Sequence, residues 1–476
     1  MLVCQHWYDI MLSIPGLHSR LMINQWGRKK DVERFGRRWL LDVVIDTTDV
    51  WDYTDSRGSN VRECLLAAAE AASRWHSLTI NSLEGHKDWC VTQPLEYLES
   101  FLLTAACVLG DFLKSLITTI TTTVTPCFTV MEILHPDAAL YLVQSAHFQI
   151  FSSLTTLRLI CPRMQNPIDI LPFLHKLEIF EAHHLSLQIY PLGVDLPLTQ
   201  TLRDLQLKSV SIQWMTGQTF SALENLTIVF PQHADAIQSV SMPSCSALGY
   251  NSNNLHALEH FHFSCLDKLE VICDESRKWS GDLQLATLCF IFAAQSLTCL
   301  QLEIRCSEQL LVYMLRLVPA LEELWMGLLT PHALSSTFFL AFAAGGCNTI
   351  TGPSGQTIEP LCRQLKVLTL YYKRWSRGAE RNGLIPAFGA IMASHPPEEQ
   401  NCSISLKFFE GPNYRSREWK IHEPVERWNV DLENDRIFFG VSSPYGIVPV
   451  SCLDDPWYHI DVPSLLLETE YISIRK

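Results

Sequence analysis

The feature that most constrains this chain is a recurring six-residue pattern, L-x-x-Φ-x-Φ, in which Φ is an apolar residue. The segment Leu154-Thr-Thr-Leu157-Arg-Leu159 is one copy, and weaker versions start at Trp75 and Leu98. Further copies start at Leu174, Leu202, Leu223, Leu258, Leu297, Leu321 and Leu365. Chance would supply roughly three such hexads in a chain this rich in leucine. The excess indicates a repeat protein.

Each hexad is typical of a short strand whose alternate side chains enter a core, while the leading leucine fills the turn before it. A single unit is too small to fold alone, so neighbouring units must stack and bury these side chains continuously. From Leu154 onward the leading residues are separated by 20, 28, 21, 35, 39, 24 and 44 positions. Regular leucine-rich repeats hold to about 20–29 residues, so we expect a degenerate array.

One interval between hexads has the pattern of a helix. Ser307 suits an N-cap, and apolar residues follow it at the i, i+3, i+4 and i+7 positions of a helix: Leu311, Met314, Leu315 and Val318. The strand Leu321 to Met326 comes directly afterwards. Because helix and strand alternate, the sequence predicts an α/β leucine-rich-repeat solenoid with a curved parallel sheet and outer helices.

Composition limits the classes of function. Of the 476 residues 47% are hydrophobic and 18% are charged, so most of the chain should fold. The net charge of −14 argues against a nucleic-acid partner. The apolar windows fall short of the roughly 20 residues that cross a bilayer, so no membrane partner is expected. Sixteen irregularly spaced cysteines indicate reduced thiols and a cytoplasmic or nuclear location.

Motifs for catalysis, cofactors or metals do not stand out. The chain has no G-x-S-x-G elbow, no H-E-x-x-H pair and no G-x-G-x-x-G loop, and Gly352-Pro-Ser-Gly355 lacks the lysine of a phosphate loop. His183 and His184 are adjacent, so a strand would point them to opposite faces, which is wrong for a shared metal. We therefore expect no catalytic residues, no cofactor, no metal and no enzymatic activity.

The first residues carry a resemblance to a known family. The spacing Val3-Cys4-x-x-Trp7-x-x-Ile10, followed by Pro15-x-Leu17, resembles the second half of an F-box, a short helical module that docks on the Skp adaptor of cullin-RING ubiquitin ligases. F-boxes joined to degenerate leucine-rich repeats are abundant in basidiomycete fungi. Residues 39–45 and 74–80 are similar to the strand and first repeat of that group. The resemblance implies a substrate-recognition subunit of a Skp-cullin-RING ligase.

The resemblance also sets the expected domain boundaries. The opening L-P-x-E-I-L helix of an F-box has no counterpart before Leu2, so the module is expected to be truncated. A plain alternative is that Val3, Cys4, Trp7, Ile10, Pro15 and Leu17 cap the end of a solenoid that has lost adaptor binding. We expect a partial F-box over 1–26, a linker with one strand over 27–74, degenerate repeats over 75–395 and an irregular C-terminal cap over 396–476.

The remaining prediction concerns the surface that binds a protein partner. Residues that flank the inward pair of each hexad point to the concave face of the arc. The candidates there are Arg158, Phe180, His260, His262, Trp325 and Tyr371. The three aromatic residues are the expected anchors, because aromatic side chains dominate interface energies. Alternatively, the C-terminal segment folds over this face, or the variety of side chains is that of an ordinary surface.

Overall fold

A computed structural model describes the greater part of the chain between residues 20 and 272 and selected segments beyond it. The described residues are 20–24, 29–30, 33, 40–47, 56–83, 89, 91–104, 115–116, 119, 127–135, 139, 148–161, 167–233, 236–252, 255–272, 297–303, 308–328, 350–351, 357–358, 361–362, 364–365, 367–372, 403–410, 415–421, 430–431, 436–443 and 446–451. The chain forms two compact units, residues 1–243 (unit 1) and residues 244–476 (unit 2). The protein is α/β, with a long parallel sheet and few helices.

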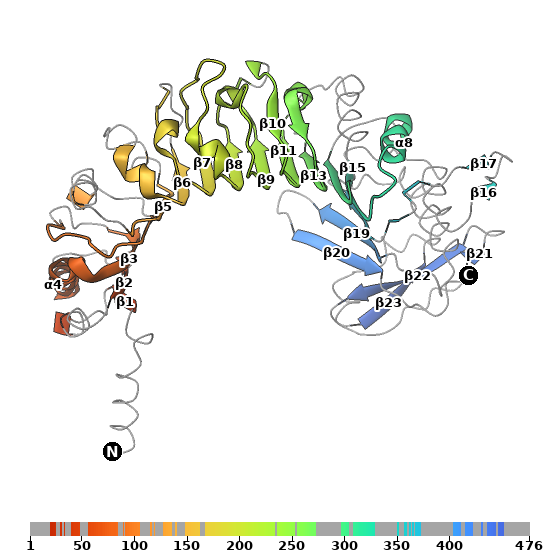
Figure 1. The fold of residues 1–476 in the computed structure, drawn as a ribbon. Helices are drawn as coiled ribbons and strands as arrows, with labels where there is room; N and C mark the ends of the chain where they lie inside the picture. Colours follow the sequence, from red (N-terminus) through yellow and green to blue (C-terminus); the bar gives the residue numbers. More distant parts are fainter. Residues whose placement is uncertain are drawn as a thin grey trace. The chain divides into compact units, whose positions relative to one another are not determined.

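Unit 1 is built on parallel strands that pair in the order in which they occur in the chain (Figure 1). They are β1 Arg20–Ile23, β2 Leu41–Asp46, β3 Trp75–Ser82, β4 Ser100–Leu103, β5 Val130–Ile133, β6 Thr156–Ile160, β7 Ile179–His183, β8 Asp204–Lys208 and β9 Asn225–Val229. A further short strand, β10, spans Val240–Met242. The predicted parallel sheet is therefore confirmed.

The core of unit 1 is two buried rows that cross these strands at matching register positions. One row contains Leu78, Phe101, Met131, Leu157, Phe180, Leu205 and Leu226, and the other contains Ile80, Leu103, Ile133, Leu159, Ala182, Leu207 and Ile228. Successive members of the first row are 23, 30, 26, 23, 25 and 21 residues apart. Within unit 1 the sequence hexads from Leu154 to Leu223 have a similar spacing, and the wider intervals between hexads lie beyond Leu223.

The backbone just before each strand repeats one hydrogen-bond pattern. The carbonyl of Thr129 accepts the amides of Thr155 and Thr156, and the carbonyl of Thr155 accepts those of Glu178 and Ile179. The same two-donor arrangement continues at the carbonyls of Glu178 and Arg203. Buried backbone amides and carbonyls need hydrogen-bond partners. Here the amides at the start of each strand donate to the carbonyl that lies just before the previous strand.

A long helix accompanies the strands of unit 1. Helix α4 spans Ser56–Glu70 beside β1 to β3 (Figure 1). Its buried residues follow the i, i+3, i+4, i+7 spacing of one helical face: Val61, Cys64, Leu65 and Ala68. The segment predicted as a linker with one strand thus contains β2, as expected, and also this helix. Several of the described connections contain 3-10 turns: η1 Ala72–Arg74, η2 Phe148–Ser153, η3 Leu171–Phe173, η4 Pro197–Gln200 and η5 Gln213–Met215.

A strained turn follows three adjacent strands. His184, Ser209 and Phe230, the first residues after β7, β8 and β9, have φ angles of 57°, 53° and 49°. The left-handed region is costly for residues that carry a Cβ atom. The amides of His184 and Ser209 each donate to the carbonyl that ends the next strand, Lys208 and Val229 respectively. The turn therefore recurs at the same place in each strand connection.

Unit 2 continues with parallel strands in chain order: β11 Ala247–Asn251, β13 Lys268–Ile272, β14 Cys299–Glu303, β15 Glu323–Leu328, β18 Val367–Tyr372 and β19 Ser403–Glu410. The buried register row here includes Leu248, Leu269, Leu300 and Leu324. Helix α8, Glu308–Arg316, precedes β15 and buries Leu311, Met314 and Leu315, as the sequence predicts. Two short strands, β16 Ile350–Thr351 and β17 Thr357–Ile358, pair antiparallel.

The hexad predicted at Leu258 is wrong as a unit of this sheet. Leu258 lies in the 3-10 turn η7, His256–His260, and the short strand β12, Phe261–Phe263, is not one of the parallel strands of unit 2. Strands β11 and β13 pair directly with each other instead. The hexads at Leu297 and Leu321 do supply strands of the sheet, namely β14 and β15.

The ends of the chain differ from the sequence-based expectations. Residues 20–23, inside the predicted helical F-box remnant, form strand β1, which pairs with β2. Within the predicted irregular cap, β19 pairs antiparallel with β20, Arg415–Ile421, and β22, Arg436–Ser443, pairs with β20, with β21, Val430–Asp431, and with β23, Gly446–Ser451.

Candidate functional site

The candidate site is the exposed face of the parallel sheet of unit 1, on the side opposite the buried rows. Strand side chains alternate between the two sides, so each strand gives this face its non-core residues. Polar and charged residues cross it in register: Glu132, Arg158, Glu181, Gln206 and Thr227 lie side by side on β5 to β9. We call this surface the sheet face. Two networks of charged side chains lie on it.

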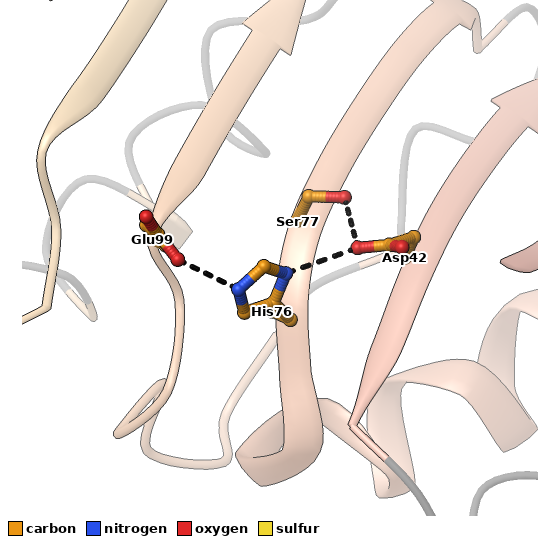
Figure 2. A network of polar contacts seen from close by, with 4 residues as sticks. All are labelled: Asp42, His76, Ser77 and Glu99. Atoms are coloured by element: carbon orange, nitrogen blue, oxygen red, sulfur yellow. Dashed lines mark hydrogen bonds and ion pairs between the residues drawn. The ribbon is translucent and has the colours of Figure 1, made fainter. Parts of the chain in front are cut away.

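The first network joins β2, β3 and the start of β4 (Figure 2). His76 Nδ1 lies 3.2 Å from Asp42 Oδ1, and His76 Nε2 lies 2.6 Å from Glu99 Oε2. Ser77 Oγ donates a hydrogen bond of 2.7 Å to Asp42 Oδ1. The ring thus stands between two carboxylates that come from the strands on either side.

An irregularity in β3 places His76 there. Leu41 pairs with Trp75 but Asp42 pairs with Ser77, so His76 is an extra residue in the β2–β3 register. Trp75 and Leu78 are both buried, while His76 and Ser77 between them are only partly buried. A β-bulge redirects side chains in this way. It gives the sheet face two successive polar residues where a regular strand would give one.

The surroundings of His76 favour its charged form. Burial by itself lowers the pKa of the ring, but hydrogen bonds to Asp42 and Glu99 and the charges of both carboxylates raise it, and the pKa lies above its usual value. An imidazole can donate from both nitrogens only when it is protonated. The ring is 44% exposed, so solvent screens these attractions.

Asp42, His76 and Ser77 are the residue types of a nucleophilic catalytic triad, but their geometry is not that of a triad. In such a triad the serine hydroxyl donates to the imidazole, which the carboxylate orients from the other nitrogen. Here Ser77 donates to Asp42, and both ring nitrogens of His76 face carboxylates. The ring therefore has no free nitrogen that could take the proton of Ser77.

The second network lies on β5 to β7. Arg158 Nη1 lies 3.3 Å from Glu132 Oε1, and Arg158 Nε lies 3.3 Å from Glu181 Oε2. The second contact is an ion pair without hydrogen-bond geometry. His183 Nε2 lies 3.1 Å from Glu181 Oε1 on the same strand. One arginine thus joins the carboxylates of two neighbouring strands across β6.

His183 has the opposite electrostatic environment to His76. Burial lowers its pKa most, and the charges of Lys208 and His184 lower it further, while Glu181 raises it. The net pKa lies below its usual value. Lys208 is the register partner of His183 on β8. The sheet face therefore holds one histidine that favours its proton and one that disfavours it.

The structure separates the predicted partner-binding residues. Arg158 lies on the sheet face as expected. Phe180 does not: it is 0% exposed and belongs to the core row, so its predicted role as an exposed anchor is wrong. The overlapping hexad Leu177-Glu-Ile-Phe180-Glu-Ala182 forms the strand, three residues later than the hexad at Leu174. Stacking on Leu157 selects this register.

The other predicted binding residues lie in unit 2. His260 ends the turn η7 and His262 lies on β12, so neither projects from the parallel sheet as predicted. Trp325 is partly exposed on β15. Tyr371 lies on β18 opposite Gly327, two register positions beyond the partner of Trp325. The residues predicted to bind the adaptor lie outside the described residues: Val3, Cys4, Trp7, Ile10, Pro15 and Leu17.

Sequence reasoning missed most of the charged residues that form the two networks. Glu132 lies in a hexad led by Phe128, with Met131 and Ile133 inward, and a search for leading leucines passes over it. The hexad at Leu174 ends at Ile179, so the sequence analysis did not place Glu181 or His183 on the sheet face, where the corrected register of β7 puts them. His76 occupies one of the variable positions of the hexad that starts at Trp75. The amino-acid sequence of that hexad gives no indication of the bulge.

The described residues offer neither a metal-binding cluster nor a membrane-spanning helix. No group of three or more His, Cys, Asp or Glu that could hold a metal occurs among the described residues. No helix in the described part of the chain is long and apolar enough to cross a membrane. No protein-family model matches the sequence, and no curated protein matches it either.

Proposed function

We propose that the chain is a leucine-rich-repeat solenoid that binds a protein partner through the sheet face, without catalysing a reaction. The observation that carries the proposal is the even spacing of the buried row in unit 1, 21 to 30 residues per strand. Leucine-rich repeats have units of about 20–29 residues, and such arrays bind along an extended sheet.

The leading residue of each unit supports the same proposal. The residue three positions before each member of the buried row is itself fully buried: Trp75, Leu98, Phe128, Leu154, Leu177, Leu202 and Leu223. Together with the inward pair, these side chains form the L-x-x-Φ-x-Φ pattern in three dimensions. A single unit of this size could not bury them, so their burial depends on neighbours on both sides.

The sheet face is suited to a protein rather than a small molecule. Its charged networks are spread over strands β2 to β7 instead of converging on one point. Small-molecule sites are concave and mostly apolar, with a few convergent polar groups. A broad surface with charges of both signs is typical of protein interfaces, in which charge complementarity provides specificity.

The test compares two charge-reversal pairs in a quantitative capture experiment from native extract. Asp204→Lys with Lys208→Glu changes the sheet face on β8, and Asp195→Lys with Lys176→Glu makes the same exchanges at exposed positions off the strands. The first pair should lose the proteins that the wild type captures, and the second should keep them. Retention by both pairs would exclude the sheet face as the binding surface.

We propose as a narrower form that the chain is the substrate-recognition subunit of a Skp-cullin-RING ubiquitin ligase, in the cytoplasm or nucleus. Its support is the resemblance of residues 3–17 to the second half of an F-box. Purified protein should retain the Skp adaptor, and a variant with Trp7→Ala and Ile10→Ala should lose it. If folded wild-type protein does not bind the adaptor, the proposal of a plain binding scaffold remains.

A further inference from the structure

We infer that His76 is a pH-dependent clamp, which in its protonated form ties β2 to the start of β4 across the bulge in β3 and on deprotonation releases Asp42. The inference stands on the positions of four side chains and is independent of any partner. It concerns the first strands of unit 1, which the proposed binding function does not require to move.

The number of hydrogen bonds that His76 can donate depends on its protonation. Both ring nitrogens of His76 lie within hydrogen-bond distance of a carboxylate oxygen, at 3.2 Å from Asp42 and 2.6 Å from Glu99. Carboxylates only accept, and a neutral imidazole has one N–H. Both contacts are therefore hydrogen bonds only in the imidazolium form. When the ring gives its proton to solvent, one contact becomes a nitrogen lone pair facing a carboxylate oxygen.

The second step identifies which contact is lost. Asp42 has a second donor, Ser77 Oγ at 2.7 Å, which stays in place when the ring is neutral. Glu99 has the shorter contact with the ring. The one remaining proton is therefore expected on Nε2, which donates it to Glu99. The lone pair of Nδ1 then faces the carboxylate of Asp42 and repels it. Deprotonation thus breaks the contact of His76 with Asp42 on β2, leaves the Ser77–Asp42 hydrogen bond in place and keeps the contact of His76 with Glu99 before β4.

The third step concerns the other charges around β3. Charged residues on the neighbouring elements are Asp42 and Asp46 on β2, Arg74 in η1 and Glu99 before β4. Arg20 on β1 is the register partner of Asp42. Among these groups Asp42 and Glu99 act on the ring, and both favour its charge. The pH response of the clamp therefore depends on one carboxylate on β2 and one just before β4.

The sign of the effect follows from linkage. The pKa of His76 is raised in the folded protein, so folding is coupled to proton binding. The added stability is fully present below the unfolded pKa of about 6.5 and is lost as pH rises through the folded pKa. We expect the amides of β2 and β3 to exchange with solvent more readily as pH rises through this window.

The experiment is hydrogen exchange at about pH 6 and about pH 8, expressed as protection relative to the intrinsic rates, with NMR titration of the histidine rings. In wild-type protein, protection of β2 and β3 relative to β8 and β9 should be about two- to fivefold higher at the lower pH, the range of exposed ion pairs. His76→Gln should remove this difference and leave low protection at both values. An unchanged pH response in His76→Gln overturns the inference.

Two variants sharpen the test. Asp42→Asn replaces the repelled carboxylate oxygen by an amide that can donate to neutral Nδ1, so protection should stay high at both pH values. His256→Gln removes a different exposed histidine, which lies 3.3 Å from Glu259, and should leave the response of β2 and β3 intact. If a variant fails to fold, the wild-type titration still decides: a His76 pKa at or below that of a free histidine overturns the inference.

Discussion

Phe180 of β7 lies opposite Leu157 of β6 in the parallel register, and both side chains are fully buried in unit 1. Ile179, one residue earlier, faces the other side of the strand and is only partly buried. The pair decides the register of β7, because a shift by one residue would exchange the two faces. The same pairing explains why the hexad that starts at Leu174 places this strand three residues too early.

The first prediction compares Phe180→Ala with Ile179→Ala in chemical denaturation. Removing a buried phenylalanine side chain leaves a cavity and should cost about 3–5 kcal/mol of unfolding free energy. The same truncation at partly exposed Ile179 should cost about 1 kcal/mol. If Ile179→Ala were the more damaging change, the register of β7 described above would be wrong.

The second prediction concerns strain at Phe230, which has a φ of 49° and is 42% exposed. The left-handed conformation costs roughly 1–2 kcal/mol in residues with a Cβ atom, and asparagine tolerates it best among them. Phe230→Asn should therefore raise the thermal midpoint. Phe230→Ala lacks the polar side chain that lets asparagine hydrogen-bond locally in this conformation and serves as control, with no comparable gain. A lower midpoint for the asparagine variant would mean that packing of the ring outweighs the strain.

The third prediction concerns Gln218, a buried amide that joins two connections. Its Nε2 donates to the carbonyl of Val194 at 2.8 Å, and its Oε1 accepts the amide of Leu196 at 3.3 Å. Gln218→Ala leaves both backbone groups without these partners and should cost about 1–3 kcal/mol. Gln218→Glu keeps the size but directs an oxygen at the carbonyl of Val194, so it should destabilise as well. Near-wild-type denaturation of both variants would contradict the role of this bridge.

The fourth prediction concerns thiol reactivity. Burial raises the pKa of the Cys161 thiol to about 12, so the nucleophilic thiolate is scarce at neutral pH. Cys127 is exposed. Alkylation of native protein followed by peptide mass spectrometry should modify Cys127 at least about tenfold faster than Cys161. In denaturant the two rates should converge, and similar rates in the native protein would show that Cys161 is not buried.

The sequence predicts most of the strands for which a leucine leads the hexad and no second hexad overlaps it, and the hexad at Leu258 is the exception. The strands around Leu157, Leu205, Leu226, Leu300 and Leu324 follow directly, because two buried side chains at alternate positions define both strand and face. Helix α8 is also predicted, since four apolar residues at helical spacing require one face to be buried.

The remaining errors arise where several local patterns are equally good. The segment Leu266-Asp-Lys-Leu269-Glu-Val271 matches the hexad as well as the one at Leu258 does, and only the pairing of Leu269 with Leu248 and Leu300 selects it. The His76 network depends on a bulge and on residues from three elements, so no local pattern contains it. Helix α4 did carry a signal, the spacing from Val61 to Ala68.

The last prediction concerns His183, whose pKa is lowered chiefly by burial and also by Lys208 and His184. In the unfolded chain this ring takes up a proton near its ordinary pKa of about 6.5, before the folded protein does. The unfolded state then binds more protons, so stability falls as pH drops through this value. The direction is opposite to that expected for His76, although both rings lie beside glutamates.

Denaturation of wild type and His183→Gln at about pH 8 and about pH 5.5 isolates this contribution, because the other titrating groups are common to both proteins. The wild type should lose more stability on acidification than the variant does. Lys208→Gln removes one of the charges that oppose protonation, so it should raise the pKa of His183 in an NMR titration and reduce the loss. Equal losses in wild type and His183→Gln would mean that burial of His183 does not control its protonation, and that its carboxylate neighbour Glu181 compensates fully.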